Sequence, residues 1–125
     1  MKTTDETLKC YLEETRHLLS LIKNDSKGYR ENLKLFSMIK DNSKILGFTT
    51  VYNLFKGIED IYKSLCDGKI AYTENLELLL KIVCGEIDEC CNLIEDGSPL
   101  LNDIDVRPYL LYCDKAVAGE IFDPS

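Results

Sequence analysis

The sequence predicts an all-α protein, an up-down four-helix bundle followed by a fifth helix. Apolar residues recur at steps of three and four through long stretches, which is the period of one helix face. Breaks rich in Gly, Asn and Asp separate these stretches, and no stretch alternates apolar and polar residues as a strand does. Long amphipathic helices joined by short connections pack as a bundle. The 125 residues are enough for one domain, 1–125, with one core.

Two helices are expected before residue 48. The first covers about residues 5–23, with Thr4 or Asp5 as its cap, and residues 24–28 form a turn. The second covers about residues 29–46. Its core side consists of Leu33, Phe36, Ile39, Ser43 and Leu46. Gly47 ends this helix because glycine accepts the left-handed conformation, and Phe48 is expected to fold back onto the last turn.

Two more helices complete the predicted core, which covers about residues 5–96. The third runs to about Cys66, with Thr49 or Thr50 as its cap. A glycine at position 57 inside it costs on the order of 1 kcal/mol relative to alanine, which a close helix crossing would explain. The fourth covers about residues 74–95 and is capped by Thr73.

A fifth helix is expected over about residues 105–120, after a break at residues 96–99. Pro108 suits its first turn, where no helical N–H is required. The last five residues, 121–125, are expected to form a loose tail.

The charge of the chain excludes several classes of partner. The formal net charge is −7, from 22 acidic and 15 basic residues. Nucleic-acid binding and attachment to anionic membranes both favour a positive surface, so neither partner is expected. No apolar run approaches the roughly 20 residues that span a bilayer, and the N-terminus lacks the apolar core of a signal peptide. The expected compartment is the cytoplasm.

The cysteines do not predict a metal site or a cofactor. There are six, at positions 10, 66, 84, 90, 91 and 113, and none forms a Cys-x-x-Cys pair. Most are expected to be small buried hydrophobes. The alternative is that Cys90 or Cys91 is exposed and forms adventitious disulfides in air. The only histidine, His17, is expected to be an ordinary boundary or surface residue.

Residues 36–48 resemble the signature helix of histidine-containing phosphotransfer (HPt) domains, above all that of the CheA chemotaxis kinases. The shared positions are Phe36, Ile39, Lys40, Ser43, Leu46, Gly47 and Phe48. The resemblance covers about residues 8–96 and, loosely, the fifth helix. Three positions depart from it. Ser37 stands in place of the phospho-accepting histidine, Asp41 in place of a glycine, and Lys44 in place of a small residue.

The resemblance implies a two-component phosphorelay partner but not the relay reaction. An acceptor histidine stands on the bundle surface, receives phosphate from a kinase and passes it to an aspartate of a receiver. Serine forms a stable phosphate ester, so Ser37 is not expected to relay phosphate, and the protein is not expected to be an enzyme. Ser37 itself is expected to face solvent.

A basic line flanks Ser37 on the second helix. It comprises Arg30, Lys34, Lys40 and Lys44, together with Asp41. One interpretation is a solvated face with helical pairs such as Glu31 and Lys34. The other is a docking site for the acidic pocket of a response-regulator receiver, or for a histidine kinase.

Two classes of function remain open from the sequence. The first is an HPt-like module that binds a receiver or kinase without relaying phosphate, as an adaptor or a competitor. The second is a structural helical module whose exposed apolar surface supports a homodimer or a larger complex.

Overall fold

The structure, a computed structural model, describes residues 5–24 and 29–120, with side chains over 6–23 and 31–120. These residues form only helices and connections, which confirms the all-α prediction. The helices are α1 (Asp5–Asn24), α2 (Tyr29–Ile45), α3 (Thr49–Cys66), α4 (Glu74–Asp96), a short 3-10 helix η1 (Pro99–Asp103) and α5 (Arg107–Val117).

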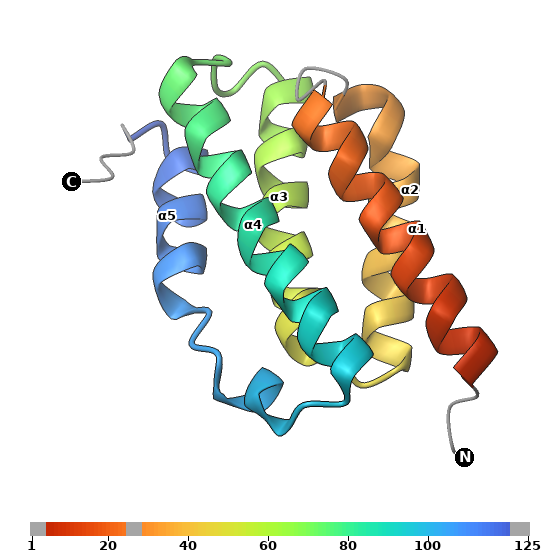
Figure 1. Ribbon diagram of the computed structural model, residues 1–125. Coiled ribbons are helices and arrows are strands. Elements are labelled where there is room, and N and C mark those ends of the chain that lie inside the picture. The colour runs from red at the N-terminus through yellow and green to blue at the C-terminus, as the bar shows by residue number, and fades with distance from the viewer. Residues whose placement is uncertain (1–4, 25–28, 121–125) are drawn as a thin grey trace.

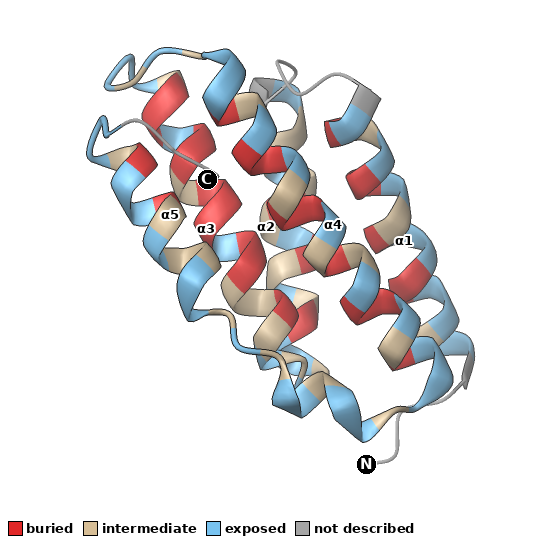
Figure 2. Cartoon of the chain, turned by 60° about the vertical axis from the view of Figure 1, so that its left-hand side comes forward, coloured by how far each residue is buried: buried red, intermediate tan, exposed pale blue. Residues whose placement is uncertain are grey.

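The first four helices form an up-down bundle in which consecutive helices run in opposite directions (Figure 1). α1 packs against α2 and α4, and α3 packs against the same two helices, so the four close around one core. α5 lies outside this ring against α3 and, to a lesser extent, α4. Its outer side is exposed, whereas the inward sides of α3 and α4 are buried (Figure 2).

Gly47 ends α2 as predicted, with a φ of +84°. The Phe48 N–H donates to the carbonyl of Ser43 at 2.8 Å, and the Phe48 carbonyl accepts from the Tyr52 N–H at 3.0 Å. Phe48 therefore closes one helix and caps the next. The prediction that Thr49 or Thr50 caps α3 is wrong, because both threonines lie inside its first turn.

The later boundaries are close to those predicted. The Thr73 hydroxyl caps α4 by accepting from the Leu76 N–H at 3.1 Å. Pro108 lies in the first turn of α5, which is shorter at both ends than the predicted 105–120. The 3-10 helix was not predicted, and the Ser98 hydroxyl caps it. Of the turn predicted at 24–28, Asn24 is instead the last residue of α1, and residues 25–28 lie outside the described residues. The proposed α1 cap at Thr4 and the tail at 121–125 also lie outside them.

The close helix crossing at Gly57 is confirmed. A Cβ added to Gly57 would lie 3.0 Å from the Cys113 sulfur and 3.6 Å from a methyl group of Leu110, both on α5. The glycine therefore lets α5 approach the α3 backbone.

Gly57→Ala should destabilise the protein by about 1 kcal/mol net, because overpacking the crossing outweighs the gain in helix propensity. Gly85→Ala is the matched control, since its Cβ on α4 meets nothing within 4 Å. That variant should gain up to about 1 kcal/mol. Urea unfolding measures both, and equal stabilisation by the two changes would refute the close crossing.

Candidate functional site

Ser37, the residue at the acceptor position, is joined to a buried carboxylate on α3. The Ser37 hydroxyl donates to Glu59 Oε2 at 2.9 Å. The Lys40 ammonium donates to Glu59 Oε1 at 2.8 Å, and Lys63 reaches the same oxygen at 3.4 Å. The Glu59 side chain is only 3% exposed. Two helices thus meet around one carboxylate whose two oxygens are both used.

The expectation that Ser37 faces open solvent is wrong. Ser37 is half-buried, and its hydroxyl is directed toward α3. The physical reason is the buried Glu59: a carboxylate out of water needs hydrogen bonds to both oxygens, and Ser37 supplies one of them. The serine therefore does not present a free nucleophile.

The electrostatics of the cluster keep Glu59 ionised. Burial by itself would raise the pKa of the Glu59 carboxyl, but hydrogen bonds from Lys40 and Ser37 outweigh it and lower that pKa. The hydrogen bond to Glu59 in turn raises the pKa of Lys40. Glu59 is therefore a weak base at neutral pH, which argues against its activating the Ser37 hydroxyl as a nucleophile.

Ser37→Ala should cost about 1 kcal/mol of unfolding free energy, because it leaves one oxygen of a buried carboxylate without its partner. Thr49→Ala is a control, since Thr49 is exposed in the first turn of α3. That change should stay within about 0.5 kcal/mol. Chemical denaturation measures both, and an effect of Ser37→Ala no larger than the control would contradict the hydrogen bond to Glu59.

The basic line on α2 continues onto α3. Tyr52, Lys56, Glu59 and Lys63 recur at steps of four and three, which places them on one side of α3. The ammonium groups of Lys40 and Lys44 lie 6.0 and 5.5 Å from the centre of the Tyr52 ring. We call this surface the basic face. Its lysines are Lys34, Lys40, Lys44, Lys56 and Lys63.

Of the residues predicted for the site, the structure places Ser37, Lys40 and Lys44 together on the α3 side of α2. Lys34 and Asp41 are exposed. Arg30 is the second residue of α2 and lies in its first turn, but its side chain lies outside the described residues. Pairing of Glu31 with Lys34 is not among the ion pairs of the described side chains.

Sequence reasoning missed Glu59, Lys56 and Lys63. A signal for Glu59 was present, because it follows the core residue Phe55 by four positions and precedes the core residue Tyr62 by three. A carboxylate on the apolar side of a helix requires partners, and such a residue points to a polar cluster.

The cysteines offer no reactive thiol in the core. The alternative that Cys90 or Cys91 is exposed is wrong, since both are buried, as are Cys84 and Cys113. Burial raises the pKa to about 12 for Cys84, Cys90 and Cys113 and to about 11 for Cys91. The exposed cysteine is Cys10.

The remaining candidates for chemistry are few. His17 is exposed, as expected of a surface residue. Within the described residues, no three His, Cys, Asp or Glu side chains gather as metal ligands would.

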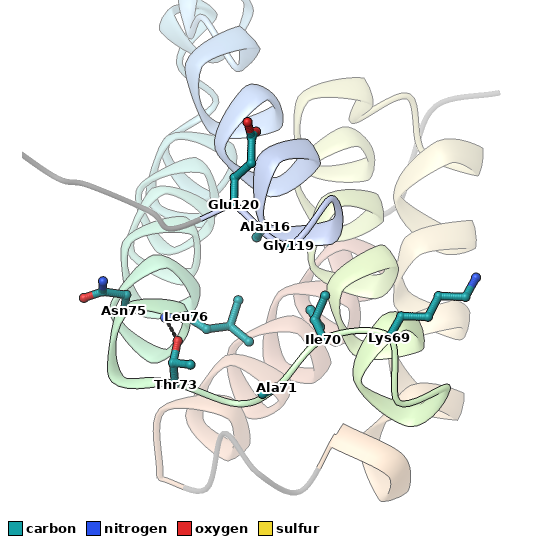
Figure 3. A pocket seen from close by; sticks show the side chains of 9 residues that line it. All are labelled: Lys69, Ile70, Ala71, Thr73, Asn75, Leu76, Ala116, Gly119 and Glu120. Carbon is teal, nitrogen blue, oxygen red and sulfur yellow. Dashed lines mark hydrogen bonds between the residues drawn. The ribbon is translucent and has the colours of Figure 1, made fainter.

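A pocket lies away from Ser37, between the α3–α4 connection and the end of α5 (Figure 3). Its volume is about 420 Å³, and no residue of the basic face lines it. The Thr73 hydroxyl in its wall is engaged as the α4 cap, as the dashed line in Figure 3 shows. Nothing in this pocket concentrates charge or a nucleophile.

None of the helices in the described part of the chain is both long and apolar enough to cross a membrane. A scan against protein-family models and searches of curated proteins and solved structures gave no match. The relation to HPt domains therefore depends on the residues of this chain alone.

Proposed function

We propose that this protein is an HPt-like module of two-component signalling that binds a response-regulator receiver, or a histidine kinase, without relaying phosphate. The observation on which this depends most is the Ser37–Glu59–Lys40 cluster. A helix that resembles the HPt signature presents, at the acceptor position, a serine whose hydroxyl is committed to a buried carboxylate. In this proposal the protein acts in the cytoplasm as an adaptor or as a competitor of a true HPt domain.

The basic face supports an acidic partner. Lys40 and Lys63 contact the buried Glu59, and Lys34, Lys44 and Lys56 add positive charge on the same two helices, in a chain whose net charge is −7. A receiver carries several carboxylates around a magnesium ion. A positive face meeting that pocket would speed the encounter and fix its register.

Reversing the charge of two exposed lysines should weaken receiver binding. Lys44→Glu with Lys56→Glu changes two positions of the basic face, whereas the donors to Glu59 are Ser37, Lys40 and Lys63. We expect the dissociation constant for a receiver to rise about tenfold or more, since like charges then face each other. Titration calorimetry against purified receivers from the source cell measures the change.

Lys81→Glu with Lys115→Glu is the matched control, because it alters the net charge equally on α4 and α5. It should leave the dissociation constant nearly unchanged. Equal weakening by both pairs would mean that net charge alone drives association. Absence of binding to every receiver and kinase would favour the second function, a structural helical module. The observation that supports this second function is the exposed apolar surface of α2 at Met38 and Ile45.

A further inference from the structure

A second surface lies on the other side of α2, in a groove between α1 and α2. The groove has a volume of about 410 Å³. We call it the α1/α2 groove. Its walls are Glu6, Thr7, Cys10, Tyr11 and Glu14 of α1, with Asn42, Ile45 and Leu46 at the end of α2. The Tyr11 hydroxyl, hydrogen-bonded to Ser43 at 2.6 Å, fixes the register of the two helices at its floor.

Ile45 and Leu46 make the α2 wall of the groove apolar, and further apolar side chains follow on the same side of α2 beyond the groove. Ile45 is 79% exposed and Met38, two turns before it on the same side of α2, is 44% exposed. Leu35, one turn further, is half-buried. Met38 and Ile45 are the two large hydrophobic side chains that α2 exposes within its described part, and both lie on one side of the helix. Large exposed apolar side chains on one side of a helix mark an interaction surface.

The α1 wall is acidic because the cations of α1 lie elsewhere. Lys9, Arg16 and Lys23 recur every seven residues on the side toward α4. There Arg16 pairs with Glu95 at 2.6 Å, and Lys23 pairs with Asp88. The exposed carboxylates of Glu6 and Glu14 remain on the groove side.

The two lysines near the end of α2, Lys40 and Lys44, are directed away from this groove. The Lys44 ammonium, although next to Ile45 in sequence, lies over the Tyr52 ring on α3. Lys40 is bound to Glu59 on the same side. The C-terminal half of α2 therefore separates two different surfaces: the ammonium groups of Lys40 and Lys44 lie toward α3, and an apolar groove wall with an acidic rim lies toward α1.

We propose that the α1/α2 groove binds an amphipathic helix of a partner protein, with an apolar stripe flanked by lysine or arginine. Charge complementarity selects this occupant, since the rim carboxylates of Glu6 and Glu14 would pair with its flanking cations. The strip from Leu35 to Ile45 extends for about 15 Å, which matches about three turns of a helix docked along it. This interaction is independent of the basic face and would let one molecule hold two different partners.

A model helix tests the proposal directly. The probe is a fluorescent peptide of about 18 residues, built of leucine and lysine with leucine on one helix face. A second peptide has the same composition in an order that gives no apolar face. Fluorescence polarisation at near-physiological salt should show binding of the first and at least about tenfold weaker binding of the second, since anchoring needs aligned apolar residues.

Ile45→Lys should weaken binding of the amphipathic peptide about tenfold or more, because it removes the most exposed apolar side chain of α2 and adds a repelling charge. Leu111→Lys is the matched control, at an exposed leucine on α5. It should leave affinity unchanged. Glu6→Gln with Glu14→Gln should weaken binding a few-fold, whereas Glu74→Gln with Glu89→Gln, remote on α4, should not. Circular dichroism checks that each variant remains folded.

Three results would overturn the proposal. Equal losses for Ile45→Lys and Leu111→Lys, or equal binding of both peptides, would mean unspecific attraction to an acidic protein. A concentration-dependent dimer in sedimentation, abolished by Ile45→Lys, would mean that a second copy covers the groove. None of these results bears on receiver binding, because that test changes Lys44 of α2 and Lys56 of α3, which belong to the basic face and not to the groove.

Discussion

Phe36→Ala should lower the free energy of unfolding by roughly 3–5 kcal/mol, the usual cost of removing a buried aromatic side chain. Phe36 is fully buried. Its ring meets Phe55 and Tyr62 edge-on, with centroids 5.6 and 5.0 Å apart. The loss therefore includes the cavity and two favourable aromatic pairs between α2 and α3. The midpoint of thermal unfolding should fall by about 10–20 °C.

Met38→Ala is the control for the rotation of α2. Met38 lies two residues after Phe36 but is 44% exposed, so its truncation should cost less than about 1 kcal/mol. Denaturant unfolding of both variants compares the two faces of one helix. Similar losses from both would mean that α2 is rotated about its axis, so that Phe36 does not face the core.

The helices could be predicted because burial enforces their period. In α4 the row Leu76, Leu80, Val83 and Ile87 follows the helical steps of four and three, and all four residues are buried. The end of α2 could also be predicted, because Gly47 is needed for a positive φ. These features depend on one residue and its near neighbours in sequence, which is why sequence alone indicated them.

The polar arrangement depends on partners far apart in sequence and was only partly predictable. Ser37 and Glu59 are 22 positions apart, and only the packing of α2 on α3 brings their side chains to 2.9 Å. The segregation of charge on α1 has the same origin. Lys9, Arg16 and Lys23 become an α4-facing row only once α4 supplies Glu95 and Asp88. The helix α3 likewise begins at an unpredicted cap because the Phe48 backbone serves two helices at once.

Restoring a histidine tests whether the likeness of residues 36–48 to HPt domains extends to their chemistry. With a purified CheA-type kinase core and ATP, the natural chain should gain no acid-labile phosphate. Ser37→His alone should gain little. The exposed Asp41 lies one turn on at i+4, where its carboxylate repels both the incoming phosphate and the kinase's negatively charged nucleotide.

The double change Ser37→His with Asp41→Gly should accept phosphate about tenfold faster than the single change or better, if removing one nearby negative charge is worth about 1.4 kcal/mol in the transition state. Glu59 favours this outcome, because its carboxylate can accept one imidazole N–H and leave the other nitrogen as the nucleophile. The new glycine should cost roughly 0.5 kcal/mol of helix stability, so the fold should survive. Initial rates of labelling at equal folded concentration measure the difference.

Ser37→Ala with Asp41→Gly is the matched control, since it opens the same space but offers no nucleophile at position 37. Acid-labile label on this control would have to lie elsewhere, and His17 is the only other imidazole. If the single histidine variant were as fast as the double, Asp41 would not be what blocks the site. If neither were labelled while both stayed folded, the likeness at residues 36–48 would be one of architecture only. The basic face would then lose its connection to phosphorelay partners, and the structural module would be the better account of this bundle.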